Sequence, residues 1–336
     1  MRKPDALTLL VFIRDWGIVI LLGLLFGVFA IWDAPFFGTW TNVGVILQAA
    51  SISALFAAAI AMGVFSGVLD LSVPGVAAFS AVIMCVLINA GQNMWLAIAV
   101  ALVIGAGLGL LNGWVSLRGL NPLAVTIGTL SITSGLAAVV TGGPALFGLD
   151  QLAFLGTEWY WGIPAPMFVV AAVYLIGTVF LTQTRGGARF MAAGGNPEAL
   201  RRAGVNANSF KLLGFVISGL LAAVGGVITS AYTSQASPSP ATGTLFTGLT
   251  AVALSGISLA GGRGSLPKVF VGALVIATIE NALLIKNIQP FWATAITGAL
   301  LILALAGDLA ITKGVAKQVV RHRTSQNQAQ SAQKAA

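Results

Sequence analysis

Few residues in this 336-residue sequence could take part in acid–base, nucleophilic or metal chemistry, and they are scattered along it. The single cysteine, Cys85, lies inside an apolar run, and the single histidine, His322, lies near the carboxyl end. One cysteine cannot form an internal disulfide, and with one distant histidine it forms no metal-ligating cluster. The sequence therefore predicts no catalytic residue, no metal site and no cofactor in this chain, and an enzyme is the least favoured class.

The chain carries little charge for its length. Hydrophobic residues make up 57% of it and charged residues 8%, whereas soluble domains carry about 25% charged residues. This composition predicts an all-α polytopic membrane protein. We therefore expect the positive charges behind its net charge of +8 to contact membrane lipid rather than nucleic acid. A charge at the bilayer centre costs about 2.5–3.5 kcal/mol, so an ionisable residue at membrane depth is a candidate functional residue.

Glu280 best meets that description, since it lies about four residues from the outer end of an apolar run, with Asn281 beside it. In one interpretation Glu280 and Asn281 line a translocation path and accept hydrogen bonds from a polar solute. In the other, the carboxylate reaches the outer interface or pairs with Lys286 or with another span.

Asp70 and Ser72 lie at the inner edge between two apolar runs. An acid just before a helix start is favourable, so capping of the next helix is the simpler interpretation. The alternative is that this turn forms an inner gate or contacts a cytoplasmic helix.

A run of hydroxyl groups follows Asn121 in another apolar segment, and it comprises Thr126, Thr129, Ser131, Thr133 and Ser134. These side chains could line a path for a neutral solute without a buried charge. Small hydroxyl residues also allow close packing of membrane helices, and both interpretations stay open.

One cytoplasmic connection, 184–211, contains a compact charged motif, GGNPEALRRAGVN, at 194–206. Its residues predict a short helix: Asn196 as N-cap, Pro197 and Glu198 in the first turn, Arg201 and Arg202 in the last turn, and Gly204 as a left-handed end. So short a helix is unstable alone in water and must dock on the protein or on a partner. The alternative is a simple arginine-rich topology anchor.

A membrane helix needs about 20 apolar residues, and this criterion predicts about ten spans. They are 16–31, 43–66, 74–90, 94–116, 122–141, 164–183, 212–232, 244–260, 268–285 and 290–307. The third, eighth and ninth are short enough to be partly re-entrant. Proline-containing segments at 121–122 (Asn-Pro), 164–166 (Pro-Ala-Pro) and 289–290 (Gln-Pro) mark helix starts.

With the N-terminus in the cytoplasm, sixteen of the seventeen basic residues fall inside and only Lys286 falls outside. This asymmetry predicts that both termini are cytoplasmic. Residues 43–141 and 212–307 then form two opposed four-helix halves, an arrangement common in transporters. The predicted organisation is a cytoplasmic segment 1–15, a transmembrane domain 16–311 and a basic polar tail 312–336.

Four segments, in order, resemble the membrane subunits of ribose- and arabinose-type ABC importers in the branched-chain amino-acid and sugar permease superfamily. They are Leu69–Val73 with its Asp-Leu-Ser-Val signature, 121–130, 194–199 with 203–205, and 258–265 with its Gly-Gly-Arg-Gly turn. The resemblance covers roughly residues 42–308.

The resemblance implies that the short cytoplasmic helix is a coupling helix that docks on a separate ATPase, which holds ATP and Mg²⁺. The implied coupling residues are Gly195, Asn196, Pro197, Glu198, Ala199, Arg201, Arg202 and Gly204. It further implies a second permease copy, identical or related, an extracytoplasmic solute-binding protein, and a bacterial inner-membrane location. The segment of Gly261, Gly262, Arg263 and Gly264 is interpreted first as a tight turn with an anchor on the inside, and its flexible backbone could also move during gating. The chain contains no Gly-x4-Gly-Lys-Ser/Thr phosphate loop of its own.

The sequence departs from the family pattern at Pro74, where glycine is common, and at Leu245 and Thr247, where many relatives carry acids. The expected function is the translocation path of an ATP-driven importer for a small neutral solute, a monosaccharide. The alternatives are a branched-chain amino-acid or nucleoside permease of the same superfamily and a secondary transporter driven by an ion gradient.

Overall fold

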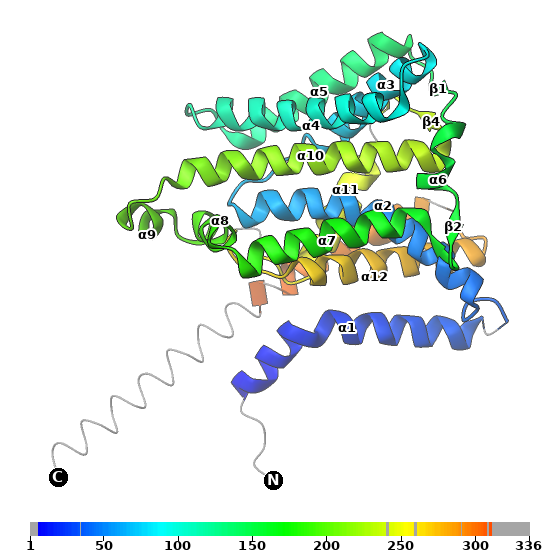
Figure 1. The fold of residues 1–336 in the computed structure, drawn as a ribbon. Coiled ribbons are helices and arrows are strands. Elements are labelled where there is room, and N and C mark those ends of the chain that lie inside the picture. The colour runs from blue at the N-terminus through cyan, green and yellow to red at the C-terminus, as the bar shows by residue number, and fades with distance from the viewer. Residues whose placement is uncertain are drawn as a thin grey trace, which may run out of the picture.

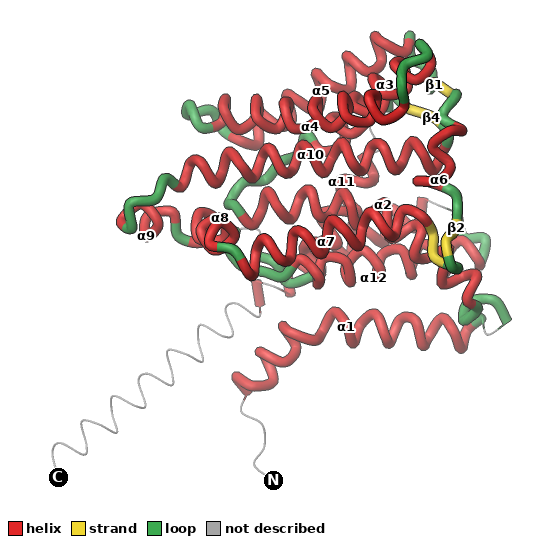
Figure 2. Tube along the Cα trace, viewed as in Figure 1, coloured by secondary structure: helices red, strands yellow, loops and turns green. Residues whose placement is uncertain are grey.

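The computed structural model describes residues 6–33, 35–239, 242–258, 261–289, 291–307 and 309–310. The predicted segment 1–15 lies partly outside these residues, and the predicted tail 312–336, with His322, lies wholly outside them. Within the described residues, helices joined by short connections make up almost the whole chain, and each strand has only two residues (Figure 2).

A helix among the described residues lies in each of the ten predicted spans. These helices are α1 (Ala6–Trp32), α2 (Trp40–Phe65), α3 (Val73–Asn89), α4 (Met94–Ser116), α5 (Pro122–Thr141), α7 (Ala165–Gln183), α10 (Ala207–Thr233), α11 (Thr242–Leu254), α12 (Leu266–Ile285) and a C-terminal helix (Phe291–Gly307). However, α1 begins at Ala6 within the predicted segment 1–15, α10 begins at Ala207, and α11 ends at Leu254 rather than at 260. Six of them, α2, α4, α5, α7, α10 and α12, are long and apolar enough to cross a membrane. The prediction of an all-α polytopic membrane protein is therefore confirmed.

The remaining elements are short and lie in the connections. They are β1 (Leu146–Phe147), the 3-10 helix η1 (Asp150–Leu152), α6 (Ala153–Gly156), β2 (Trp159–Tyr160), β3 (Ile163–Pro164), α8 (Arg185–Gly195), α9 (Pro197–Arg202) and β4 (Gln235–Ala236). β1 pairs antiparallel with β4, and β2 pairs antiparallel with β3.

Asparagine caps set several helix starts. The Oδ1 atom of Asn121 accepts a hydrogen bond from the N–H of Leu123 at 2.9 Å, and Pro122 is the first residue of α5. Asn93 caps α4 in the same way by accepting the N–H of Trp95 at 2.9 Å. The predicted start at Asn121–Pro122 is therefore confirmed, and proline fits there because its missing N–H has no partner in a first turn.

α2 and α10 form the centre of the bundle (Figure 1). Gly214 of α10 lies against Ser66 just after α2, and Gly225 lies against Phe56 within α2, so the two helices run antiparallel. α2 also packs against α11 and α12, while α10 also packs against α3 and α4. The packing is thus reciprocal: the first helix of each four-helix segment contacts the second and third helices of the other.

The α4–α10 contact depends on glycine. A Cβ atom built on Gly219 of α10 would lie 2.2 Å from the carbonyl oxygen of Gly105, and one on Gly109 would lie 2.2 Å from the carbonyl oxygen of Phe215. Gly105, Gly109 and Gly113 follow each other at four-residue spacing on one face of α4. Glycine at this spacing lets membrane helices approach until their backbones touch.

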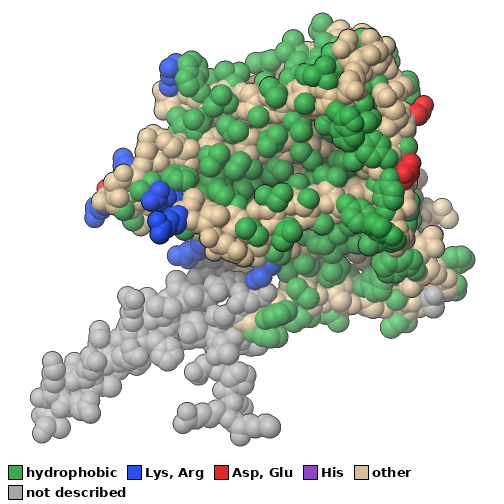
Figure 3. Space-filling model, viewed as in Figure 1, with side chains coloured by type: hydrophobic (Ala, Val, Ile, Leu, Met, Phe, Trp, Pro, Cys, Tyr) green, Lys and Arg blue, Asp and Glu red, His purple; other side chains and the backbone are tan. Residues whose placement is uncertain are grey.

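Charge separates the two ends of the bundle (Figure 3). The basic end carries, among the described residues, Arg118, Arg185, Arg189, Arg201, Arg202, Lys211, Arg263 and Lys268, and the acidic end carries Asp33, Asp150 and Glu158. The face between the two ends in Figure 3 is largely apolar, and many large hydrophobic side chains are exposed, as expected of a surface in contact with lipid.

Two helices start within the bundle after non-helical segments. α3 follows the segment 66–72, whose Ser66, Asp70 and Ser72 are fully buried. α11 has 13 residues, or about 20 Å of helix, and follows an extended segment that includes 235–239. Non-helical backbone at membrane depth is tolerated where protein or a water-filled cavity surrounds it, so these two segments are candidates for functional positions.

Candidate functional site

The helix predicted in the basic connection is present as α9. The Oδ1 atom of Asn196 accepts the N–H of Ala199 at 2.9 Å and caps the helix. Glu198 pairs with Arg201 and, at 3.3 Å, with Arg202. These side chains are exposed, so the ion pairs contribute little to stability and the face that they form remains accessible.

One apolar side chain holds α9 against the body of the protein. Leu200 is 8% exposed and packs with Ala193 and Ala207. Gly204 then ends the helix with φ +74°, the left-handed conformation that the sequence predicts. Its N–H donates to the carbonyl oxygen of Arg201 at 2.9 Å.

The preceding helix, α8, is absent from the prediction. Its sequence RGGARFMAAGG contains four glycines, which have low helix propensity. Burial compensates, because Phe190 is fully buried and stacks edge-on against Phe180 with ring centroids 5.6 Å apart. Thr184 caps the helix by accepting the N–H of Gly187 at 2.9 Å. The Thr184 cap and the helical spacing of the buried Gly187, Phe190 and Ala193 are the signals that the sequence offers for it.

Three connections meet backbone to backbone at the basic end, in a contact that we call the glycine junction. It comprises Gly67 after α2, Gly194 at the end of α8, and Gly261 and Gly262 between α11 and α12. A Cβ on Gly194 would lie 2.3 Å from the carbonyl oxygen of Phe65 and 2.8 Å from the backbone nitrogens of Gly67 and Gly262. Only a residue without a side chain fits there.

The rest of the predicted cytoplasmic turn surrounds this junction. Gly262, with φ +74°, lies against the backbone of Gly195, and Gly264 lies against Ile257. Arg263 is exposed. The structure therefore brings together two groups of predicted residues, the α9 region and the 261–264 turn, that lie about 60 positions apart in sequence.

Asp70 belongs to a buried hydrogen-bond chain across three elements. Its Oδ1 atom accepts the Ser72 hydroxyl at 2.5 Å and the Ser72 N–H at 2.9 Å. The Nδ2 atom of Asn112 donates to the Ser72 hydroxyl at 2.9 Å, and the Thr129 hydroxyl donates to Oδ1 of Asn112 at 2.6 Å. The chain joins the segment before α3 to α4 and α5. The other carboxylate oxygen of Asp70 and the Ser218 hydroxyl have no hydrogen-bond partner among the described residues.

Other predicted path residues serve local structure. Asn121 is exposed and caps α5. The Thr126 hydroxyl donates to the carbonyl oxygen of Pro122 in its own helix at 3.0 Å. Of the hydroxyl run in α5, Thr129 is the member whose side chain bonds to another helix.

At the acidic end, the Nδ2 atom of Asn281 donates to Oδ1 of Asn42 on α2 at 2.9 Å. Lys286 pairs with Asp33 at 3.2 Å rather than with Glu280. Glu280 is partly buried and has no hydrogen-bond or ion-pair partner among the described residues.

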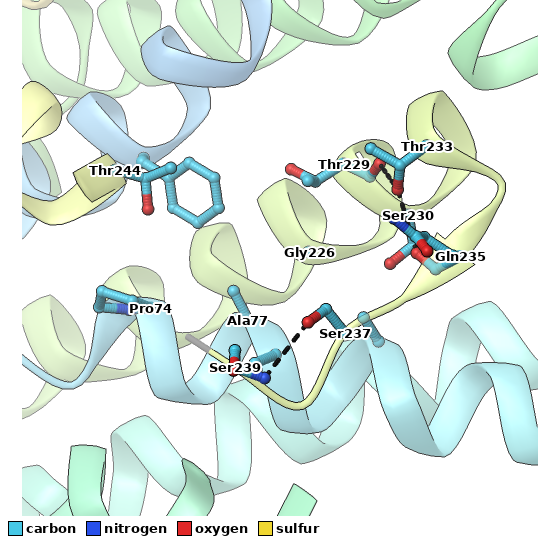
Figure 4. A pocket seen from close by; sticks show the side chains of 13 residues that line it. Pro74, Ala77, Gly226, Thr229, Ser230, Thr233, Gln235, Ser237, Ser239 and Thr244 are labelled. Carbon is cyan, nitrogen blue, oxygen red and sulfur yellow. Dashed lines mark hydrogen bonds between the residues drawn. The ribbon is translucent and has the colours of Figure 1, made fainter. Parts of the chain in front are cut away.

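A cavity of about 130 Å³ lies between α2, α3, α10, α11 and the extended segment 235–239 (Figure 4). Its apolar lining consists of Phe56, Pro74, Ala77, Ala78, Ala81 and Gly226, and its polar lining of Thr229, Ser230, Thr233, Gln235, Ser237, Ser239 and Thr244. No ionisable side chain is among these lining residues. The volume is well above the roughly 10–15 Å³ of accessible space that a cavity needs to hold one water molecule.

None of the predicted path residues lines this cavity. The polar stretch SQASPSPATG at 234–243 lies between two predicted spans and has the composition of a surface loop. Its prolines, followed by a short apolar run, are the available signal that the chain re-enters the bundle before α11 begins.

A sequence model of the family described as "Branched-chain amino acid transport system / permease component" matches residues 42–305. The chain is 34% identical over 297 residues to the L-arabinose transport system permease protein AraH of Escherichia coli (strain K12), covering 88% of this chain and 90% of that protein. It is 30% identical over 281 residues to the ribose import permease protein RbsC of the same organism, covering 82% and 88%. It is 30% identical over 320 residues to the D-allose transport system permease protein AlsC, also of that organism, covering 93% and 96%.

Among solved structures, the chain is similar to an inward-facing metal-chelate type ABC transporter. The TM-score is 0.54 at 16% sequence identity, over 87% of this chain and 97% of the other. At this identity the likeness shows a shared fold alone.

Proposed function

Because this chain belongs to the family of branched-chain amino acid transport system permease components, we propose that it forms the translocation path of an ATP-driven importer for a monosaccharide. The relatives named for arabinose, ribose and allose support a sugar. The observation that carries the proposal is the cavity, whose mainly apolar lining includes several hydroxyl and amide side chains and no ionisable side chain. Such a lining suits a neutral polyol, whereas the two charges of an amino acid would lack partners there.

The energy for transport comes from a separate ATPase subunit, which binds ATP and Mg²⁺. The exposed face of α9 is its docking surface, and Asn196, Glu198, Arg201 and Arg202 are on that face. Movement of α9 reaches the membrane helices through the glycine junction, because Gly194 touches the connections that follow α2 and α11.

The basic end faces the cytoplasm, and the chain crosses a bacterial inner membrane ten times with both termini inside. The distribution of basic residues supports this orientation. The described basic residues gather at one end, and the exception, Lys286, is paired with Asp33 at the other end. The rule counts lysine and arginine residues rather than net charge, so Lys286 remains a single exception to the asymmetry.

Two further partners complete the importer. A second permease copy packs on α5, whose exposed face carries Ala124, Gly128, Ser131 and Gly135 at helical spacing. A Cβ on Gly128 or Gly135 would meet no atom within 4 Å, and small residues on an open membrane-helix face favour close association. An extracytoplasmic binding protein delivers the sugar at the acidic end.

The test is uptake by liposomes that contain the chain together with its co-purified ATPase and binding protein. We expect ATP-dependent accumulation of at least one of L-arabinose, D-ribose and D-allose, and none of L-leucine. Accumulation of leucine without any of the three sugars would show that the transported solute is an amino acid and not a sugar. Uptake by the chain alone under a sodium or proton gradient would overturn the importer itself.

The docking surface has its own test in cells. The double substitution Arg201→Glu with Arg202→Glu should abolish co-purification of the ATPase while membrane insertion stays normal. Arg118→Glu, at the same end but in the connection between α4 and α5, is the matched control and should co-purify normally. Equal co-purification of the two variants would refute α9 as the docking surface.

A further inference from the structure

The cavity has two unlike walls. One wall is apolar and is formed by Phe56 of α2 with Pro74 and the alanines of α3. Most of the polar side chains, which we call the polar wall, come from α10 and from the segment 235–239, which itself contacts α3 through β4 (Figure 4). A sugar ring has the same division, since its faces present C–H groups and its edge presents hydroxyl groups. Sites for small ligands commonly combine an apolar lining with a few placed polar groups in this way.

Ser230 on the polar wall has an unused hydrogen-bonding group. Its side chain is 4% exposed and lines the cavity. Serine in a membrane helix commonly donates to the carbonyl oxygen four residues earlier, as Thr229 does to Gly225 at 2.7 Å. Ser230 makes no such bond among the described residues. The hydroxyl therefore opens to the cavity, where water or a solute can bond to it.

The neighbouring hydroxyls are oriented as acceptors. Thr229 and Thr233 each donate to a backbone carbonyl, and Thr233 lies 3.1 Å from that of Gln235. With the proton directed to the backbone, each hydroxyl oxygen offers its lone pairs to the cavity. The Ser237 hydroxyl accepts the N–H of Ser239 at 3.3 Å. The polar wall therefore presents both acceptor and donor positions, which is what a polyol requires.

We propose that this cavity is a solute-binding subsite in which Thr229, Ser230 and Thr233 bind the hydroxyl edge of one neutral sugar while Phe56 covers a C–H face of its ring. The subsite extends the function proposed above and depends on it. It places solute contact on α10 and the re-entrant segment 235–239, in place of the hydroxyl run of α5 and Glu280.

The first experiment compares initial uptake rates, at a sugar concentration below half-saturation, of liposomes that contain the whole importer. Ser230→Ala removes one neutral hydrogen bond, worth about 0.5–1.5 kcal/mol, so the rate should fall about twofold to tenfold. Ser230→Leu fills the cavity, so the uptake rate of that variant should fall further. Thr182→Val is the matched control, since the Thr182 hydroxyl bonds within α7 on an exposed face. Equal rates in all three variants would overturn the subsite.

The second experiment detects occupancy without requiring turnover. In a Ser230→Cys variant, reaction with N-ethylmaleimide should be slowed by a saturating concentration of the transported sugar. The native Cys85 is fully buried, and the unsubstituted protein measures its background reaction. Unchanged labelling with the sugar present would overturn the subsite.

The two proposals fail in different ways. If the unsubstituted importer accumulates no sugar, the proposed function fails. If it accumulates sugar while the Ser230 variants match the control and the cysteine is unprotected, the function stands and the subsite fails.

Discussion

Replacement of Gly194 by alanine adds one methyl group to the glycine junction. Its carbon atom would lie 2.3 Å from the carbonyl oxygen of Phe65 and 2.8 Å from the nitrogens of Gly67 and Gly262. All three neighbours are backbone atoms, so none can rotate away, and one connection must separate from the other two by close to 1 Å. Overpacking of this kind costs about 1–3 kcal/mol.

The neighbouring glycine provides a matched control. A Cβ on Gly195 would lie 3.4 Å from the Cα atom of Gly262 and farther from every other atom, which is an ordinary contact. Gly194→Ala and Gly195→Ala therefore add the same methyl group one residue apart at the end of α8, with and without a clash. A difference in stability or uptake between the two variants therefore measures the clash at the glycine junction and not a change in helix propensity.

Two measurements follow for each variant: the temperature of half-unfolding of the detergent-solubilised protein, and ATP-dependent uptake by the reconstituted importer. A penalty of about 1–3 kcal/mol shifts an equilibrium roughly fivefold to 150-fold. The Gly194→Ala variant should unfold at a temperature several degrees lower, and its uptake rate should fall at least fivefold. Its rate of ATP hydrolysis should fall less than its uptake rate. Gly195→Ala should remain within twofold of the unsubstituted protein. Indistinguishable behaviour of the two variants would refute the reasoning.

Three further substitutions test other contacts. Asn196→Ala removes the α9 cap and about 1 kcal/mol of helix stability, so affinity for the ATPase, measured by titration in detergent, should fall about fivefold; unchanged affinity would show that the cap is dispensable. Gly219→Leu should block the α4–α10 contact and lower the unfolding temperature, whereas Gly128→Leu on the open face of α5 should not; similar unfolding temperatures would contradict the glycine packing. Asp70→Leu strands the buried Ser72 groups and should destabilise by about 1–3 kcal/mol or more, whereas Asp70→Asn keeps an acceptor and should cost less, and equal loss of stability in both would argue against the hydrogen-bond chain.

Much of the bundle could be predicted because membrane helices need a length and an apolar composition that are visible in sequence. Caps and prolines then located their ends, as at Asn121 and Asn196. α8 was missed because propensity is a weak signal where tertiary burial decides, and the burial of Phe190 depends on Phe180 in another helix.

The candidate path was harder to predict, because hydroxyl groups have two uses in membranes. Thr126 and Thr229 look alike in sequence, and both donate to their own helix. Only the arrangement of the helices places Thr229 at a cavity and Thr126 elsewhere. The position of Ser237 at the cavity could likewise not be predicted, because the polar composition of 234–243 is the same as that of a surface loop.

The two-residue ladder between β1 and β4 has a mechanical consequence. Phe147, which is exposed, pairs with Gln235, which lines the cavity, and Leu146 pairs with Ala236. A force applied to residues 142–147 is therefore carried by backbone hydrogen bonds to Gln235 at the edge of the cavity. A protein that binds these residues would act on the cavity through the same two-residue ladder.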